Sequence, residues 1–199
     1  MIFVFGIHCN MSTLGIEILL TVQWEQNSVK KGVLLKSLRF FENKQNLLEH
    51  SENNSLKIIN ERAKLSEPIF INLLTLKRKL IEYGSGKRVD LGQTVHNLNL
   101  IKLKTLFSTE FARKVIKYLI TNVKYGDTAS YSDIGKGIHS KAYQAIGTVL
   151  RNNPLPLIIP CHRVIRKDGS IGGFMGKTSK DNGWHINLKK RLLELEKSY

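Results

Sequence analysis

The sequence predicts an α/β protein of the α+β kind with two domains, over residues 1–103 and 104–199. Three observations predict this class. The chain opens with short apolar runs of β-like pattern, helical spacing dominates after residue 68, and the composition changes near residue 104. With 199 residues and 42% hydrophobic content, the chain can bury a core in each of two small domains.

The N-terminal domain is predicted to be a small antiparallel sheet followed by a helix. Apolar runs over residues 2–7, 15–24 and 33–41 predict three strands, with a polar turn at 26–28. Residues 42–66 predict a loose helix or a connector. A helix then starts at Pro68 and ends before the Gly-Ser-Gly of 84–86. Its apolar residues recur at helical spacing: Ile69, Leu73, Leu76, Leu80 and Tyr83. Residues 87–104 look extended and linking.

The C-terminal domain is predicted to be mostly helical. Ser108 or Thr109 caps a first helix, and Ser130 with Asp133 forms a capping box for a short helix over 131–138. A second short helix follows over 141–151, which completes the helix-turn-helix pattern. Ala142 and Ala145 keep one face of this second helix slim enough to approach a DNA groove. An ordinary helical hairpin in a core is the alternative.

The charge indicates a polyanionic partner. Lys and Arg outnumber Asp and Glu by 31 to 16, a formal charge of +15, and the excess is greater in residues 104–199, where the counts are 17 and 7. Nucleic acid is one partner of this kind, and a solvated basic face is the alternative.

Targeting, membrane and metal signals are weak. Residues 1–7 lack the basic region of a signal peptide, and no run approaches the roughly 18 apolar residues of a membrane span. Two cysteines favour free thiols in a reducing compartment. A zinc site would need His8, Cys9, Cys161 and His162 around one ion, an arrangement that the sequence disfavours because it uses two pairs of neighbours. We therefore expect neither a metal nor an organic cofactor.

The segment Pro160-Cys161-His162-Arg163-Val164 carries the predicted chemistry. A lone cysteine is usually a small buried hydrophobe. Here His and Arg follow it directly, and such neighbours are expected to lower the pKa of the thiol and to favour a nucleophilic thiolate.

This segment resembles the signature of the O6-alkylguanine-DNA alkyltransferases. The resemblance extends over residues 107–196, with Tyr131, Arg151-Asn152-Asn153-Pro154 and Gly172-Gly173 in register. The N-terminal half shares only the sheet-then-helix pattern and Tyr83-Gly84. For that half the resemblance implies a ribonuclease H-like domain, and for residues 104–199 it implies a DNA-binding and catalytic domain.

The resemblance implies that Cys161 attacks the alkyl carbon and that His162 draws the thiol proton through a water. A carboxylate should orient this histidine. The last helix offers Glu194 and Glu196, and only Glu196 falls on the apolar stripe of Leu188 and Leu192. Periodicity thus selects Glu196, and the family's glutamate aligns there too.

The same resemblance assigns the remaining site residues. Tyr131 would crowd the target phosphate and help to protonate the departing guanine, and Asn153 would be the hinge before the active-site strand. The main-chain carbonyls of Cys161 and Val164 would read the 2-amino group, and the Met175 amide would meet O6. Ser132 and Arg151 resemble positions that contact the DNA backbone.

Three departures from the family stand out. Gln144 replaces the arginine finger that fills the gap left by the flipped base. Phe174 and Met175 follow Gly-Gly where the family has Tyr and a small or polar residue. A longer loop, 177–183, precedes Trp184.

The sequence therefore predicts a monomeric DNA repair protein in the cytoplasm, or in the nucleus of a eukaryote. It would flip O6-alkylguanine, and O4-alkylthymine as well, out of double-stranded DNA and transfer the alkyl group irreversibly to its own cysteine. The main alternative is a non-catalytic, alkyltransferase-like damage sensor, but such sensors typically lack the cysteine. A helix-turn-helix transcription factor and a cysteine hydrolase are the other classes; nothing in the sequence marks the oxyanion hole that the hydrolase needs.

Overall fold

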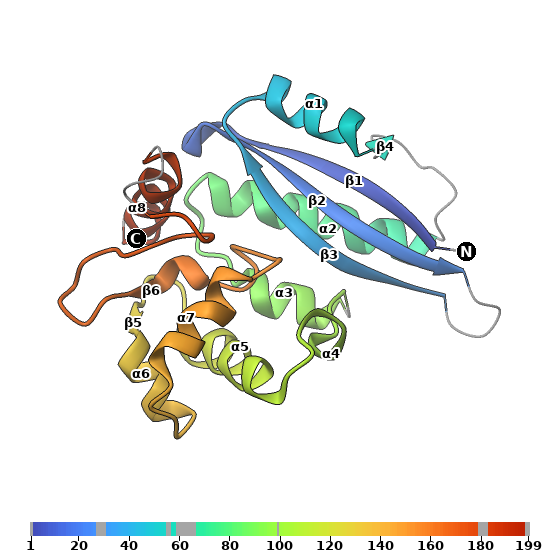
Figure 1. Ribbon diagram of the computed structural model, residues 1–199. Helices are drawn as coiled ribbons and strands as arrows, with labels where there is room; N and C mark the ends of the chain where they lie inside the picture. Colours follow the sequence, from blue (N-terminus) through green and yellow to red (C-terminus); the bar gives the residue numbers. More distant parts are fainter. Residues whose placement is uncertain are drawn as a thin grey trace. The chain divides into compact units, whose positions relative to one another are not determined.

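The chain divides into two units, Met1–Lys102 and Leu103–Tyr199, and each contains its own buried apolar residues (Figure 1). The computed structural model describes residues 2–26, 31–54, 57–58, 67–98, 100–178 and 183–197. Within these residues, no helix is both long enough and apolar enough to cross a membrane. The fold is mixed, with a small, mainly antiparallel sheet and a mostly helical remainder.

The N-terminal unit is built on a sheet of order β3-β2-β1-β4. Its strands are β1 (Ile2–Met11), β2 (Ile16–Gln26), β3 (Lys31–Phe41) and β4 (Lys57–Ile58). The first three pair antiparallel, as the sequence predicts, and β4 adds a parallel edge to β1. The consecutive residues Ile16 to Leu19 of β2 are all buried, and Ile18 lies directly opposite the buried Phe40 of β3.

Helix α2 (Glu67–Gly84) packs along β1, with Leu73, Leu76, Leu80 and Tyr83 buried, which confirms the helical spacing. A 3-10 turn, η1 (Ser12–Leu14), joins β1 to β2, and α1 (Lys44–Asn53) lies within the predicted loose helix or connector of 42–66. Residues 55–56 and 59–66 of that connector, and residues 27–28 of the predicted turn, lie outside the described residues.

The prediction that residues 87–104 are extended is wrong. Helix α3 (Leu91–Asn97) occupies the middle of this segment, and α4 (Leu103–Leu106) begins at its end. Asp90 caps α3 by accepting a 2.8 Å hydrogen bond from the Gln93 amide. Leu91 and Val95, one helical turn apart, are both buried. The cap, together with packing of α3 against α2, accounts for this short helix.

The C-terminal unit contains α5 (Glu110–Asn122), α6 (Tyr131–Gly137) and α7 (Tyr143–Arg151). Thr109 caps α5, and the capping box of Ser130 and Asp133 is present at α6. Helix α7 begins two residues later than predicted, because the Tyr143 amide bonds to the Lys141 carbonyl and Ala142 is not helical. These three helices pack against one another and bury apolar side chains that include Leu119, Ile134, Ile146 and Leu150.

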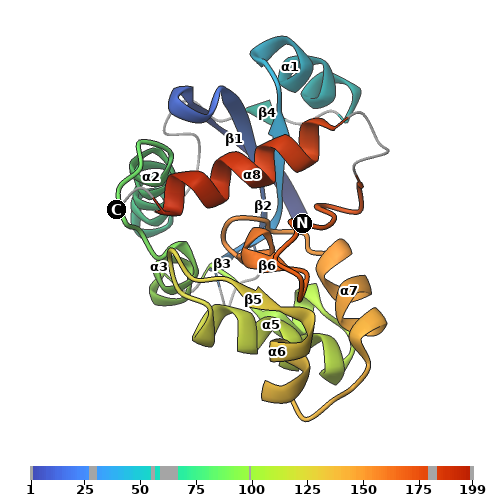
Figure 2. The same ribbon diagram turned by 90° about the vertical axis from the view of Figure 1, so that its left-hand side faces the viewer.

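Two short parallel strands carry the site segment. Strand β5 (Ala129–Ser130) pairs with β6 (Val164–Ile165), which follows the 3-10 turn η2 (Cys161–Arg163). In Figure 2 these strands lie between α8 (Trp184–Lys197) on one side and α5 to α7 on the other. Residues 179–182 of the loop before α8 lie outside the described residues.

Candidate active site

A cavity of about 640 Å³ lies against Cys161 and is bounded by α7 and by residues 173–178. Six of the predicted site residues line it: Tyr131, Gln144, Arg151, Cys161, Phe174 and Met175. The structure thus brings together residues that are up to 44 positions apart in the sequence (Tyr131 to Met175). Tyr143, Thr148, Arg166 and Lys177 also line the cavity and were not singled out from the sequence.

The Cys161 side chain is held by Asn153. Asn153 Nδ2 donates to Cys161 Sγ (3.1 Å) and to the Ile159 carbonyl (3.0 Å), and its Oδ1 accepts from the Leu155 amide (3.0 Å). All three contacts of this amide are therefore local. They fix the chain between the end of α7 and the thiol, which is itself 6% exposed.

The expectation that Arg163 and His162 lower the pKa of the thiol is wrong. Burial raises the pKa of Cys161, and the Asn153 hydrogen bond and the charge of Lys189 oppose this only in part. Arg163 makes no contribution to lowering this pKa, because its guanidinium donates to Glu196 and to the Val123 carbonyl. The thiol therefore needs a base to become a nucleophile.

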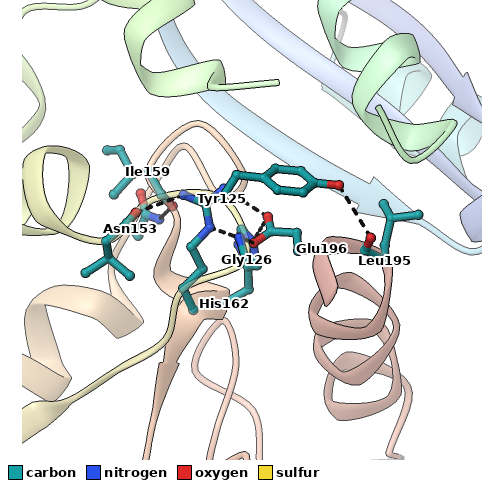
Figure 3. A network of polar contacts seen from close by, with 9 residues as sticks. Tyr125, Gly126, Asn153, Ile159, His162, Leu195 and Glu196 are labelled. Carbon is teal, nitrogen blue, oxygen red and sulfur yellow. Dashed lines mark hydrogen bonds and ion pairs between the residues drawn. The ribbon is translucent and has the colours of Figure 1, made fainter. Parts of the chain in front are cut away.

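His162 and Arg163, which follow the cysteine in the chain, both contact the carboxylate of Glu196. Figure 3 shows His162 beside Glu196, with Tyr125 and Gly126 close to them. His162 Nε2 lies 2.8 Å from Glu196 Oε1. Arg163 donates from Nε to Oε2 (2.8 Å) and from Nη2 to Oε1 (2.9 Å), a bidentate pair. The Gly126 amide adds a 3.3 Å bond to Oε2, and the Tyr125 hydroxyl anchors the end of α8 by donating to the Leu195 carbonyl (3.4 Å).

These contacts set the charges of the pair. Burial acts to raise the pKa of Glu196, but the hydrogen bonds and charges of His162 and Arg163 outweigh it and hold this pKa well below the usual range. Burial lowers the pKa of His162 despite the carboxylate beside it. The site at neutral pH is therefore an ionised Glu196 paired with Arg163 and a neutral His162, whose Nε2–H donates to the carboxylate. In this tautomer Nδ1 is the basic nitrogen.

Periodicity correctly distinguished the two glutamates of α8. Glu196 is 2% exposed, whereas the Glu194 side chain is 62% exposed and faces Lys190 at 3.9 Å. The pairing of Arg163 with Glu196 was not predicted, because the arginine was assigned to the thiol.

Lys189 is a second residue that sequence reasoning missed. It is 1% exposed, and its Nζ donates to the carbonyls of Val164 (2.6 Å), Ile171 (2.7 Å) and Gly173 (3.0 Å). An ammonium group has three donors, so the three carbonyls use all of them. Burial lowers its pKa to about 8. Lys189 thereby joins β6 to the start of the cavity wall. Its place seven residues before Glu196, on the same helix face, is the signal that could have found it.

The cavity wall opposite α7 is a tight turn. Phe174 and Lys177 exchange backbone hydrogen bonds of 2.9 Å in both directions, and Met175 and Gly176 between them have φ of 51° and 77°. Two consecutive residues with positive φ are typical of a type I′ turn. Phe174 is buried in this wall, and Met175 faces the cavity.

The other predicted residues lie around this cavity without lining it. His162, Glu196, Asn153 and the Val164 carbonyl lie behind Cys161. Ser132 lies in the first turn of α6, where its hydroxyl is 2.7 Å from that of Ser130. The side chains of His8 and Cys9, considered for zinc, lie outside the described residues.

Comparison with known proteins places these features in context. Residues 110–198 match the family model described as 6-O-methylguanine DNA methyltransferase, DNA binding domain. The methylated-DNA--protein-cysteine methyltransferase of Archaeoglobus fulgidus is 38% identical over 119 residues, which cover 60% of this chain and 71% of that protein. The constitutive protein of that name from Bacillus subtilis is 31% identical over 120 residues, which cover 60% and 67%.

A solved structure is similar over nearly the whole chain. The crystal structure of Mycobacterium tuberculosis OGT in complex with DNA has a TM-score of 0.60 and 26% identity, and the match covers 98% of this chain and 93% of that one.

Proposed function

The chain belongs to the methylated-DNA--protein-cysteine methyltransferase family, and we propose that it repairs DNA by transferring the alkyl group of O6-alkylguanine to its own Cys161. The observation that carries this proposal is the position of Cys161. The thiol lines a cavity, is held by Asn153, and is followed in the chain by a histidine bonded to a buried carboxylate. A sensor that only binds damaged DNA has no use for such a nucleophile.

His162 acts as the base in the proposed mechanism. Glu196 holds the Nε2–H tautomer, so the Nδ1 lone pair can take the thiol proton through a water. The ionised carboxylate then stabilises the imidazolium that forms. Arg163 keeps the carboxylate charged and fixed, and therefore acts on the thiol only through Glu196 and His162.

The transfer itself is a displacement at the alkyl carbon. The Cys161 sulfur forms a bond to this carbon, the bond from carbon to O6 breaks, and its electron pair remains on the guanine. Tyr131, which lines the cavity, donates a proton to the departing base. Burial raises the pKa of Tyr131, which keeps its proton available until the base becomes negative. The thioether product has no route back to a thiol, so each molecule acts once.

Base recognition is assigned to the two sides of the cavity. The carbonyls of Cys161 and Val164 would accept from the 2-amino group, the Met175 amide would donate to O6, and Phe174 would pack against the ring. Lys189 donates to one of the two lone pairs of the Val164 carbonyl and fixes its position, and the other lone pair is the one assigned to the 2-amino group. The same contacts would accept O4-alkylthymine only in part, since thymine lacks the 2-amino group.

DNA is the proposed partner, and a single copy of the chain is the proposed binding unit. We assign α6 and α7 to a helix-turn-helix motif with α7 as recognition helix, and the N-terminal sheet of order β3-β2-β1-β4 to a ribonuclease H-like domain. Gln144 and Arg151 are exposed on α7, and Ser132 is in the first turn of α6. These three residues are assigned to DNA contacts. We assign this repair reaction to the cytoplasm, or to the nucleus if the protein is eukaryotic.

Intact mass spectrometry tests the proposed function. After incubation with duplex DNA that contains O6-methylguanine, the protein should gain one methyl group in place of one hydrogen, and Cys161→Ala should gain none. Tight binding of the same duplex without any gain in mass would indicate a damage sensor instead.

A further inference from the structure

One large aromatic side chain is exposed beside the active-site cavity. Tyr143 is the first residue of α7, is 43% exposed and lines the same cavity as Cys161. Among the described residues, the other large hydrophobic side chains of comparable exposure are Ile71, Leu74 and Ile81, which all belong to α2. Among the described residues of the unit that carries the nucleophile, Tyr143 is thus the large hydrophobic side chain that is exposed.

The ring of Tyr143 is supported from below by a glycine. A Cβ atom at Gly135 of α6 would lie 2.6 Å from Tyr143 Cε1 and 3.2 Å from its Cδ1. No side chain fits between them, so the ring rests directly on the backbone of α6. A ring that is braced on one side and exposed on the other loses little freedom when it stacks on a partner.

The face of α7 that presents Tyr143 also approaches the catalytic residues. Gly147, one helical turn later, would place a Cβ atom 3.7 Å from Cε1 of Tyr131. Gln144 and Thr148 line the cavity from the same helix. Tyr143 therefore lies at the cavity that contains Cys161, on the helix that also contributes Gln144 and Thr148 to its wall.

Flipping a nucleotide into this cavity leaves a gap in the base stack. Proteins offset the lost stacking by inserting a side chain, and aromatic rings stack on any base because every base has a π-face. Gln144, the neighbour of Tyr143, has an amide that can hydrogen-bond the orphaned base but has neither a ring nor a charge.

We propose that Tyr143 is the stacking residue of this protein and that its ring contacts the bases next to the gap left by the flipped nucleotide. The inference rests on the proposed function. In this proposal Tyr143 supplies the stacking surface, and Gln144 supplies hydrogen bonds to the unpaired base. Because a stacking contact releases no counterions, the contribution of Tyr143 should be the same at low and high salt, unlike that of a basic residue.

Two substrates separate stacking from chemistry. Single-turnover transfer rates are measured on duplex DNA with O6-methylguanine, at protein concentrations below saturation, and on free O6-benzylguanine, which needs no flipping. The variants are Tyr143→Ala and Tyr143→Phe. The matched control is Ile81→Ala, which truncates a side chain of similar exposure (45%) on α2.

Measured at low and at high salt, Tyr143→Ala should slow the duplex reaction by about five- to a hundredfold more than it slows the benzylguanine reaction, and this ratio should be the same at both salt concentrations. Tyr143→Phe and Ile81→Ala should change neither rate by more than about twofold. Equal losses on both substrates, or no loss on either, would overturn the inference. If the unaltered protein accepts an alkyl group from neither of the two substrates, the proposed function is refuted instead.

Discussion

Replacing Glu196 by Gln should weaken the fold and slow the transfer. The substitution removes the charge that faces the buried Arg163, which makes two contacts of 2.8 and 2.9 Å to the carboxylate. Breaking one side of a buried ion pair typically costs about 3–5 kcal/mol, because the remaining charge is uncompensated. For a chain of this size that corresponds to a Tm decrease of about 6–20 °C. The Gln amide also puts N–H donors against the donors of Arg163, so it cannot replace the pair.

The effect on transfer follows from the same contact. Without the carboxylate charge the imidazolium of His162 is less stable and its tautomer is no longer fixed, so the general-base catalysis by His162, which is typically worth about 100-fold or more, is weakened or lost. Thermal unfolding gives the stability, and the benzylguanine reaction at a temperature well below the lowered Tm gives the rate. Glu194→Gln is the control, because that side chain is exposed and its ion pair with Lys190 is long, at 3.9 Å. Its stability effect should stay within about 0.5 kcal/mol. Equal effects of the two substitutions, in Tm or in rate, would refute the assigned network.

Three further predictions concern single residues. Cys161→Ala should abolish transfer and keep the affinity for duplex DNA, as measured by fluorescence anisotropy; residual transfer would place the nucleophile elsewhere. Gln144→Arg should speed repair of methylguanine in duplex DNA and barely change the benzylguanine rate, because the gain lies in flipping; an equal gain on both would contradict this role. Burial lowers the pKa of Lys189 to about 8 from 10.5, so between these pH values the unfolded chain holds a proton that the folded chain has lost, and folding becomes more favourable as pH rises. In urea titrations, the stability of the unaltered protein relative to Lys189→Met should therefore increase by up to about 3 kcal/mol across this window, and a constant difference would show that Lys189 titrates normally.

The polar network shows what periodicity can and cannot predict. Glu196 could be selected from the sequence because a helix stripe needs only spacing. Lys189 obeys the same spacing but was passed over, because a lysine is normally solvated. Its burial depends on three carbonyls that converge from residues 164, 171 and 173, and only the folded turn brings them together.

Tertiary contacts also explain the other differences. Arg163 follows the cysteine in sequence, yet its guanidinium reaches Glu196, 33 residues away. Burial of the thiol therefore raises its pKa, contrary to the sequence-based expectation. Helix α3 was not predicted because the sequence marks it only by the cap residue Asp90 and by one pair of apolar residues, which is too little to indicate a helix. The importance of Tyr143 could not be inferred from the sequence, since it depends on the contact with Gly135.

The most direct test of the account is the number of methyl groups that each protein molecule accepts. The protein is incubated with a large excess of duplex DNA containing O6-methylguanine, the methyl groups transferred are counted over time, and the modified peptide is identified by mass spectrometry. The account predicts a plateau at one methyl group per protein molecule, located on Cys161. Continued turnover beyond one, or a methyl group on Cys9 or on any other residue, would contradict it.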